Sequence, residues 1–320
     1  MDRDNKKPRI TNTQGHTHLD LIALIPEEDI WLASRHSRET RRAYKNDVCD
    51  FINTTKMRSR ADLKGINHRA VVFWKRCMEE RGLKPGTIRR KLSSLSSLFI
   101  HLIKHGVVTH NPVRDVERPP ASIREGRTAC FSSGEARKIL DFPPTNTIRG
   151  LRDRAILSVG LQVGARRSEI AALKVKDFHK NRGYWALHFI RKGRRDLDVS
   201  IHPQVAQRIL EYMDVTHHGK DVDEPLFLPI GRSWKNPDMR RSLSPDTIDR
   251  ILKKYAKRIG LERGFSAHSM RATFITTALE NGASLEDVQR AVGHDDPSTT
   301  KLYDRRRINP ERSASFYANY

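Results

Sequence analysis

Several side chains in the second half of the chain have the chemistry to hold an anionic group. Arg166 and Arg167 stand together between two apolar helical runs, with Glu169 close behind them. His268 and Arg271 are three residues apart on an expected helix, so they share one face of it. A guanidinium group donates several hydrogen bonds in a fixed geometry to anionic oxygens, and it stays charged over the physiological pH range. An imidazole accepts or donates protons near neutral pH, so such a face could bind a phosphate group and move a proton beside it.

Three further reactive side chains occur at other points of the same half. Lys192 lies in a basic hairpin and is followed by a glycine. His294 follows Gly293 after a short expected helix, and Tyr303 lies nine residues beyond His294. Taken alone, each of these residue types is most often structural, and an HxxR pair recurs by chance in many proteins. Their order along the chain is therefore more informative than any one of them.

The net charge of the chain points to a polyanionic partner. Lysine and arginine number 60 against 38 aspartates and glutamates, a formal net charge of +22. Neutralising phosphates releases counterions and gives binding without a special pocket, so nucleic acid is the first candidate. Charge alone does not choose between DNA, RNA and an anionic membrane surface.

The sequence shows no sign of membrane insertion, secretion or metal binding. No uninterrupted apolar stretch is longer than the five residues of Leu21–Ile25, far short of the roughly 18 residues that span a bilayer. No apolar segment follows the basic start as in a signal peptide, so we expect a cytoplasmic protein. Cys49, Cys77 and Cys130 form an odd, widely spaced set, which argues against a disulfide framework and a zinc site. We recognise no acidic triad, histidine cluster or P-loop, and expect no metal or other cofactor.

The first half of the chain is typical of a polar tail followed by a helical domain. Residues 1–24 are polar, basic and without period. Apolar residues at helical spacing then predict an all-helical domain over residues 25–110. The Pro-rich and aperiodic residues 111–127 predict a linker. Four helices are expected in the helical domain: after Pro26, after Ser37, over about 68–81, and from Thr87 as N-cap to Gly106.

The last of these helices has an unusual polar face. Basic and hydroxyl residues alternate with its apolar stripe, and no acid occurs from Ile88 to His105. Short hydroxyls flanked by arginine permit close approach to a phosphate backbone, whereas the alternative is an ordinary basic surface. We predict DNA contacts from one face of this helix and a neighbouring arginine: Arg89, Arg90, Ser94, Ser97 and His101.

The second half of the chain predicts a mixed domain. Ser132 and Glu135 form a capping box that opens a helix. Residues 184–190 and 197–201 carry β-type side chains on either side of a basic turn, which predicts a hairpin. The other expected helices cover about 151–161, 203–213, 245–259, 267–280, 284–291 and 297–303. The expected fold class is therefore mainly α with a small antiparallel β-sheet.

The ordered motifs of this half closely resemble those of the tyrosine recombinase (phage integrase) family. The motifs are GARRSE at 164–169, the Lys-Gly hairpin at 192–193, HSMRATF at 268–274 and VGHDDPSTTKLY at 292–303. The resemblance covers about Ser132 to Tyr303, and residues 25–110 match the family's helical core-binding domain more loosely. It implies a mixed α/β catalytic domain over 128–308. It also implies a Xer-like site-specific recombinase that cleaves and rejoins DNA through a 3′-phosphotyrosyl intermediate, in integration, excision or resolution.

The resemblance implies roles for the motif residues, and each role has a physical basis. Tyr303 would be the nucleophile that stores the broken phosphodiester as a covalent ester. His268 would accept its proton. Arg166 and Arg271 would hold the non-bridging oxygens, on which charge builds in the transition state.

Three other motif residues would support this reaction. By the resemblance, His294 adds a third donor to the phosphate, Lys192 protonates the leaving 5′-hydroxyl, and Glu169 buttresses the first arginine. Arg167 stands where the family usually has an apolar residue, so either arginine of the pair could enter the site. The spacing to Glu169 favours Arg166.

Two alternative functions share parts of this description. A type IB topoisomerase relaxes supercoils with the same chemistry, and a silent DNA-binding protein would have the fold without catalysis. Chain length, integrase-like spacing and the C-terminal extension favour recombination over relaxation. Competent residues at every catalytic position argue against the silent protein.

The expected partner is double-stranded DNA, bound by a protein that is monomeric in solution and forms a homotetramer in the DNA synapse. The tail at 309–320 contains Phe316, Tyr317 and Tyr320, which would expose considerable apolar surface to water. The tail could fold back onto its own domain or dock in trans onto a neighbouring protomer. The family resemblance favours docking in trans.

Overall fold

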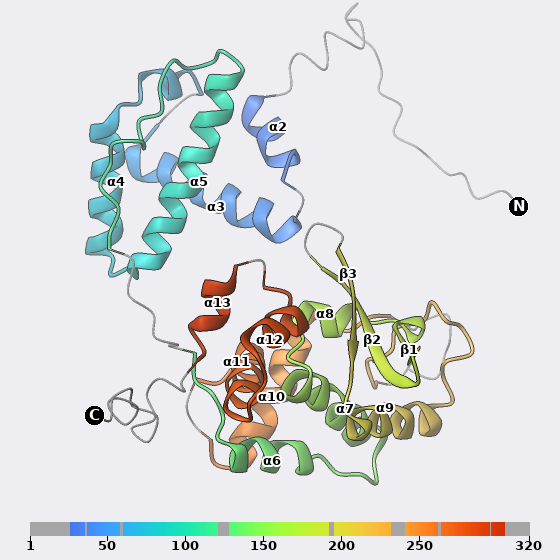
Figure 1. Ribbon diagram of the computed structural model, residues 1–320. Helices are drawn as coiled ribbons and strands as arrows, with labels where there is room; N and C mark the ends of the chain where they lie inside the picture. Colours follow the sequence, from blue (N-terminus) through green and yellow to red (C-terminus); the bar gives the residue numbers. More distant parts are fainter. Residues whose placement is uncertain are drawn as a thin grey trace, which may run out of the picture. The chain divides into compact units, whose positions relative to one another are not determined.

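The structure, a computed structural model, divides the chain into two compact units, Met1–Ile123 and Arg124–Tyr320 (Figure 1). The residues that it describes are 26–35, 37–57, 60–120, 128–191, 195–231, 241–261, 264–294 and 296–304. Within these ranges, no helix combines the length and the apolar character needed to cross a bilayer.

The described part of the first unit is helical. Its elements are α2 (Glu27–Ala33), α3 (Arg38–Thr55), the 3-10 helix η1 (Arg60–Gly65), α4 (His68–Glu80) and α5 (Pro85–Lys104). Fully buried side chains from four of them meet in one core, among them Trp31, Phe51, Trp74 and Leu95. The four α-helices expected from apolar spacing are therefore all present.

Helix α5 begins earlier than the sequence analysis predicted. Its first residue is Pro85 and its N-cap is Lys84, whereas Thr87 had been predicted as the N-cap. Proline suits the first helical position because its φ is already helical and its missing N–H would have no partner there. The proline therefore determines the start of this helix.

The beginning of the predicted linker packs onto the first unit. Val113 and Val116 are buried in the core of this unit. The side-chain amide of Asn111 donates to the hydroxyl of Ser96, at 2.9 Å. Residues 111–120 are therefore part of the first unit, and a linker can begin only after them.

The second unit combines helices with one small sheet. Its described helices are α6 (Ser133–Asp141), α7 (Ile148–Gln162), α8 (Arg167–Ala172), η2 (Val175–Asp177), α9 (Pro203–Thr216), α10 (Pro245–Arg258), α11 (Ala267–Glu280), α12 (Leu285–Val292) and α13 (Pro297–Lys301). The predicted capping box is present, with the Ser132 hydroxyl and the Glu135 carboxylate each accepting from the other's backbone N–H. The fold class predicted from the sequence, mainly α with a small antiparallel sheet, is confirmed.

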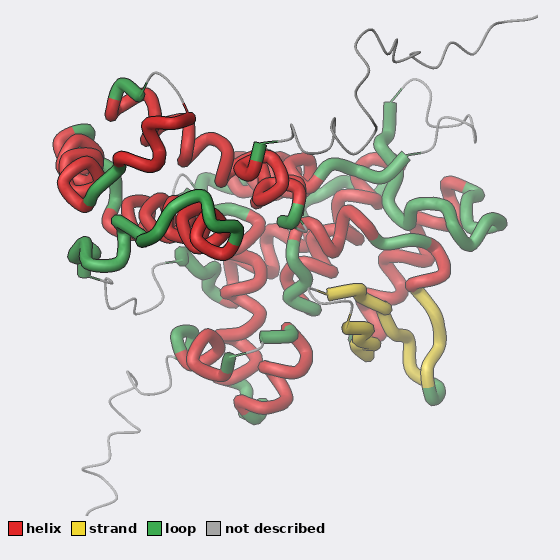
Figure 2. Tube along the Cα trace, turned by 90° about the horizontal axis from the view of Figure 1, so that it is seen from above, coloured by secondary structure: helices red, strands yellow, loops and turns green. Residues whose placement is uncertain are grey.

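The sheet contains the predicted hairpin and one further strand. Strands β1 (Phe178–Asn181), β2 (Tyr184–Arg191) and β3 (Arg195–Ser200) are antiparallel in the order β1-β2-β3. They lie together at one edge of the second unit in both views (Figures 1 and 2). Strand β1 was not predicted, because its four residues, FHKN, carry little apolar signal.

Helices α7 and α11 form the centre of this unit. Every residue of α7 from Ala155 to Leu161 is buried, and α11 packs against it with Met270 fully buried. A central pair of buried helices has little freedom to move. Side chains that leave α11 on its other face are therefore held in fixed positions.

Candidate active site

Most of the residues that the motifs singled out lie together in the second unit. His268 and Arg271 leave α11, and Arg166 is the N-cap of α8. His294 follows α12 and Tyr303 follows α13. Figure 1 shows these four helices in one part of the unit. The fold thus brings together side chains from four separate stretches of sequence.

His268 and Tyr303 are in direct contact. The imidazole Nε2 lies 3.0 Å from the phenolic oxygen. The tyrosine is buried among apolar side chains of α11 and α12, which include Ile275 and Val292, and its carbonyl accepts from the Thr276 hydroxyl. Packing around the ring and a hydrogen bond to the backbone therefore fix the position of the candidate nucleophile. The imidazole beside its hydroxyl could accept the phenolic proton.

The surroundings of His268 favour its neutral form. One side of the residue is open to solvent. Partial burial of the imidazole lowers the pKa of His268 below its ordinary value, and the positive charges of Arg271 and Arg166 add to that effect. A neutral imidazole with an unprotonated Nε2 can accept a hydrogen bond from the tyrosine hydroxyl, and then its proton.

Arg166 is held by an acid and by a carbonyl group. Its backbone N–H donates to one carboxylate oxygen of Glu169, at 2.8 Å, and its guanidinium donates to the other, at 2.7 Å. A second guanidinium nitrogen donates to the carbonyl of Gly293, at 3.3 Å. Gly293 ends α12 in the left-handed region, at φ +59°, where glycine is favoured. Glu169 therefore positions the arginine next to the His294 segment.

Arg167 has a different environment from its neighbour. Its guanidinium donates to the carboxylate of Asp246 on α10, at 3.0 Å, and both side chains are exposed. The two arginines occupy successive positions at the start of α8, so their side chains leave the helix in different directions. Only Arg166 of this pair contacts the Gly293 carbonyl.

Arg271 is almost completely buried, with 2% of its surface exposed. Its guanidinium donates to the carbonyls of Gly164 and Val292, at 2.7 and 2.6 Å. Gly164 has φ +70°, and a Cβ there would come within 2.4 Å of the Phe274 ring. The close packing of this turn on α11 thus requires glycine, and it brings a carbonyl to the arginine.

His294 is oriented by a residue that the sequence analysis did not single out. Its Nδ1 lies 2.9 Å from the hydroxyl of Thr300, which is fully buried. The Gln289 side chain donates to the His294 carbonyl, at 3.0 Å. A hydrogen bond at one ring nitrogen sets the direction of the other. Thr300 lies within the VGHDDPSTTKLY motif, so the motif already contained it without indicating its contact.

Some predicted features fall outside the described residues. Strands β2 and β3 pair as far as Arg191 and Arg195, and Lys192 lies between them in the sequence. The structure therefore leaves the role of Lys192 as a prediction. The same holds for the tails at 1–24 and 309–320, including Phe316 and Tyr317.

The predicted DNA-contacting residues of α5 do not form one exposed face. Ser94 is fully buried, and the hydroxyl of Ser97 accepts from the indole N–H of Trp31, at 3.2 Å. His101 lies against a carboxylate of α2. Helices α2 and α3 cover this side of α5, which is the physical reason why Ser94 is not available to DNA. The prediction is therefore wrong for Ser94.

The two arginines of this set remain partly exposed. Arg90 forms an ion pair with Asp47 and keeps 46% of its side chain exposed. Arg89 donates to the carbonyl of Pro119, at 2.9 Å. Both guanidinium groups thus lie at the surface of the first unit with a partner in the same unit.

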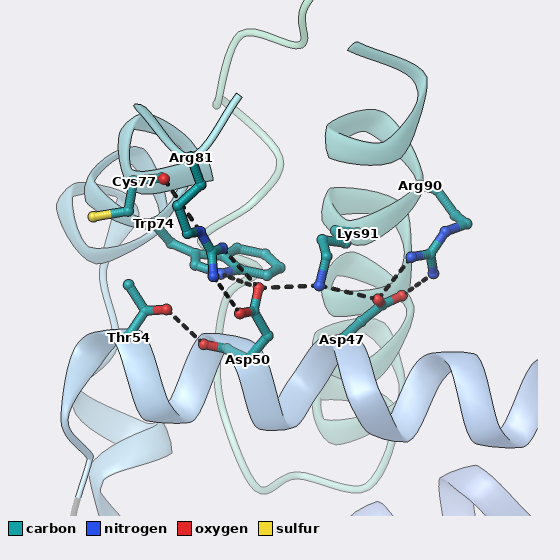
Figure 3. Close-up of polar contacts among 8 residues, drawn as sticks. All are labelled: Asp47, Asp50, Thr54, Trp74, Cys77, Arg81, Arg90 and Lys91. Atoms are coloured by element: carbon teal, nitrogen blue, oxygen red, sulfur yellow. Dashed lines mark hydrogen bonds and ion pairs between the residues drawn. The ribbon is translucent and has the colours of Figure 1, made fainter. Parts of the chain in front are cut away.

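A network of charges joins α3, α4 and α5 beside Arg90 (Figure 3). Asp50 accepts from both terminal nitrogens of Arg81, at 2.8 and 3.1 Å, and from the indole N–H of Trp74. Lys91 lies between Asp50 and Asp47, at 3.0 and 3.4 Å. The hydrogen bonds from Arg81 hold the pKa of Asp50 far below its ordinary value, with Lys91 and Trp74 contributing. We name these residues the α3–α5 network: Asp47, Asp50, Trp74, Arg81, Arg90 and Lys91.

Sequence comparisons connect both units to known proteins. The profile of the phage integrase family matches residues 130–309. That of the phage integrase N-terminal SAM-like domain matches residues 27–106. Tyrosine recombinase XerD of Listeria monocytogenes is 26% identical over 285 residues, covering 83% of this chain and 88% of the relative. Tyrosine recombinase XerC of Thermodesulfovibrio yellowstonii is 28% identical over 284 residues, covering 86% and 88%.

Structural comparison finds the same fold in solved recombinases. The XerH site-specific recombinase in a post-cleavage complex with palindromic difH substrate has a TM-score of 0.69 at 18% identity, covering 87% of this chain and 79% of that one. A lambda integrase tetramer bound to a Holliday junction has a TM-score of 0.64 at 17% identity, covering 91% and 82%. At these identities the likeness establishes the fold.

Proposed function

The chain belongs to the phage integrase family, and from that premise we propose that it is a site-specific DNA recombinase that works through a 3′-phosphotyrosyl intermediate. It is a tyrosine recombinase by its similarity to XerC and XerD along most of its length. The observation that carries the proposed chemistry is the 3.0 Å contact between His268 Nε2 and the Tyr303 hydroxyl. Arg166 and Arg271 lie near enough to His268 for their positive charges to lower its pKa, and they are the donors that we assign to a phosphate group.

The contact between His268 and Tyr303 supports a first step in which the phenol becomes a nucleophile. The proton of Tyr303 passes to Nε2 of His268, and the phenolate oxygen attacks the phosphorus atom of a DNA strand. The bond from phosphorus to the 5′ oxygen breaks and leaves a 3′-phosphotyrosyl ester. The leaving 5′ oxygen takes up a proton, for which Lys192 stays the predicted donor. In rejoining, a 5′-hydroxyl attacks the ester and the tyrosine leaves.

The anchoring of the two arginines supports stabilisation of the transition state. Negative charge builds on the non-bridging oxygens during attack, and donors that are already in place lower its energy without reorganisation. Arg271 is fixed by two carbonyls and Arg166 by Glu169 and a third carbonyl. We therefore assign Arg166, rather than Arg167, to the phosphate. His294, oriented by Thr300, would supply a further donor.

We propose that the DNA-bound form is a tetramer of a protein that is monomeric in solution. The lambda integrase with which this chain shares its fold has been solved as a tetramer on a Holliday junction. Trans docking of residues 309–320 would link neighbouring protomers in a closed ring. Because the proposed substrate is cellular DNA, the expected cytoplasmic location is retained.

A plasmid assay tests this function against topoisomerase activity. A binding sequence is first selected from a random pool of double-stranded DNA with the purified chain. Two directly repeated copies are then placed on a supercoiled plasmid and incubated with the protein. We expect two smaller circles, one copy of the site on each, and no product with the Tyr303→Phe variant.

Each other outcome of this assay contradicts the proposal in a distinct way. Relaxation that does not depend on the inserted sites would identify a type IB topoisomerase. Tight binding to the selected sites without any covalent product would identify a silent DNA-binding protein.

A further inference from the structure

Three side chains with metal-binding chemistry lie together between α2 and α5 in the first unit. Glu27 is the first residue of α2, His101 lies in the last turn of α5, and His105 is the C-cap of that helix. The Nε2 atom of His101 is 2.8 Å from the Glu27 carboxylate, and the two imidazole centroids are 4.4 Å apart. One potential ligand atom from each residue lies within 4.8 Å of the others.

We propose that Glu27, His101 and His105 bind a divalent transition metal ion, with Zn²⁺ the best match. Two imidazoles and one carboxylate form a donor set that suits Zn²⁺, whereas Mg²⁺ and Ca²⁺ prefer oxygen ligands alone. Bonds of about 2 Å in a tetrahedral site place ligand atoms roughly 3.3 Å apart. No pair of ligand atoms would therefore have to close by more than roughly 1.5 Å.

The side chains have the freedom to make this adjustment. His105 is exposed at the end of α5, so rotation about its side-chain bonds meets little resistance. His101 and Glu27 are more enclosed, with side-chain exposures of 13% and 29%. Two ligands are thus already placed by packing and the third can turn toward them. The fourth position of the ion would face solvent and take a water molecule.

The C-terminal end of α5 favours a cation although the whole chain is basic. The first turn of α2 consists of Glu27, Glu28 and Asp29. The end of α5 presents backbone carbonyls, where the helix dipole is negative and attracts cations. Lys104 is the one fixed positive charge in the last turn of α5, and it is exposed.

A bound ion would fasten α2 to the rest of the unit. Helix α2 has seven residues, too few to be stable without tertiary contacts. Its packing is anchored by the fully buried Trp31, whose indole N–H donates to Ser97. Glu27 and His101 are 74 residues apart, so an ion shared between them would cross-link distant parts of the chain. This revises the expectation, drawn from the sequence, that no metal is bound.

The test uses the untagged full chain, stripped of metal with EDTA and then dialysed free of it. Zn²⁺ affinity is measured by competition with a chromophoric chelator, and Co²⁺ serves as a spectroscopic probe of geometry. The variants are His105→Ala and Glu27→Gln, with His110→Ala as the matched control, because His110 is an exposed histidine of the same unit outside the cluster. Thermal unfolding is recorded with and without Zn²⁺, and the metal-free curves show whether each variant folds.

We expect the wild type to bind Zn²⁺ with micromolar or tighter affinity and to melt several degrees higher with the ion, because a ligand of the native state stabilises it. The Co²⁺ complex should have the intense visible absorption of a tetrahedral site. His105→Ala and Glu27→Gln should each weaken binding at least tenfold and remove the thermal shift, whereas His110→Ala should change neither. Equal Zn²⁺ affinity and equal thermal shift in the wild type and the His105→Ala variant would overturn the proposal. So would the absence of any thermal shift in the wild type.

Discussion

The two polar clusters of this protein anchor their arginines with different sets of partners. In the α3–α5 network, Arg81 and Arg90 donate to the carboxylates of Asp50 and Asp47. In the candidate active site, Arg271 donates to two backbone carbonyls, and Arg166 donates to both the Glu169 carboxylate and the Gly293 carbonyl. A carbonyl fixes a guanidinium without cancelling its charge, whereas a carboxylate does both. The first cluster therefore joins helices through ion pairs, whereas in the second cluster backbone carbonyls of other segments also anchor the arginines, as the proposed binding of a phosphate requires.

The two clusters also differ in the charge state that their surroundings stabilise. In the network, the Arg81 hydrogen bonds lower the pKa of Asp50, so the acid stays charged and paired. In the active site, partial burial and the charges of two arginines lower the pKa of His268, so the base stays neutral. Cations thus stabilise an ion in the network, and in the active site they add to the effect of burial, which keeps the imidazole neutral.

The largest effect is expected from the proton acceptor. His268→Gln should slow single-turnover cleavage of a nicked suicide duplex about 10²- to 10⁴-fold, the usual contribution of a general base. Binding of the duplex should stay within a few fold. A cleavage rate within tenfold of wild type would show that the tyrosine proton leaves by another route.

The pH dependence of wild-type cleavage sharpens this prediction. In the proposed mechanism His268 works only when neutral, so activity should be lost as the pH falls through its folded pKa. Because that pKa is lowered, the acid limb should have its midpoint below about 6.5, the ordinary histidine value. A midpoint above that value would contradict the electrostatic account.

The paired arginines provide the next test. Arg166→Ala should slow cleavage about 10²- to 10³-fold, as when a donor to a developing oxyanion is removed. Arg167→Ala is the matched control and should stay within a few fold, since Arg167 pairs with the exposed Asp246. Both are measured on the same suicide duplex. The reverse ranking would show that Arg167 enters the site.

A smaller effect, on stability alone, is expected in the network. Asp50→Asn should lower the free energy of unfolding by about 1–3 kcal/mol, because it removes the charged partner of Arg81 and Lys91. Since the pKa of Asp50 is lowered, its stabilisation is present above the ordinary carboxyl pKa and is lost as the pH falls toward the folded value. Urea unfolding at pH 7 and in acid measures both effects.

An exposed ion pair of α4 supplies the control for Asp50. Glu80 pairs with Arg76 at the surface, and Glu80→Gln should change the free energy of unfolding by less than about 1 kcal/mol. Equal losses in the Asp50 and Glu80 variants would mean that the network contributes no more than a surface pair.

The smallest effect is expected from the exposed arginines of α5. The double variant Arg89→Ala/Arg90→Ala should weaken DNA binding and reduce the slope of log affinity against log salt by about one unit. We expect one unit rather than two because Arg90 is already paired with Asp47. Ser94→Ala should leave the slope unchanged, since Ser94 is buried. A loss of two units would show that the ion pair gives way to phosphate.

The sequence could predict features that depend on neighbouring residues in the chain, but not the contacts between helices. Helix α11 was predicted with its observed bounds, whereas the start of α5 was placed too late, with Thr87 as N-cap instead of Lys84. The motif residues of the site could be named because their order is specific, although their contacts could not. The partners Asp47 and Asp50 were missed, because pairing between helices depends on packing that no local pattern contains. For the same reason Ser94 was assigned to an exposed face that α2 and α3 cover.

The most direct test of the account is the identity of the amino acid that becomes joined to DNA. The protein is incubated with a nicked suicide duplex that carries the selected site, the covalent complex is digested with trypsin, and the DNA-linked peptide is sequenced. The account predicts a 3′-phosphate ester on Tyr303 and no adduct with the Tyr303→Phe variant. Attachment at Tyr317 or Tyr320, or an adduct formed by Tyr303→Phe, would contradict it.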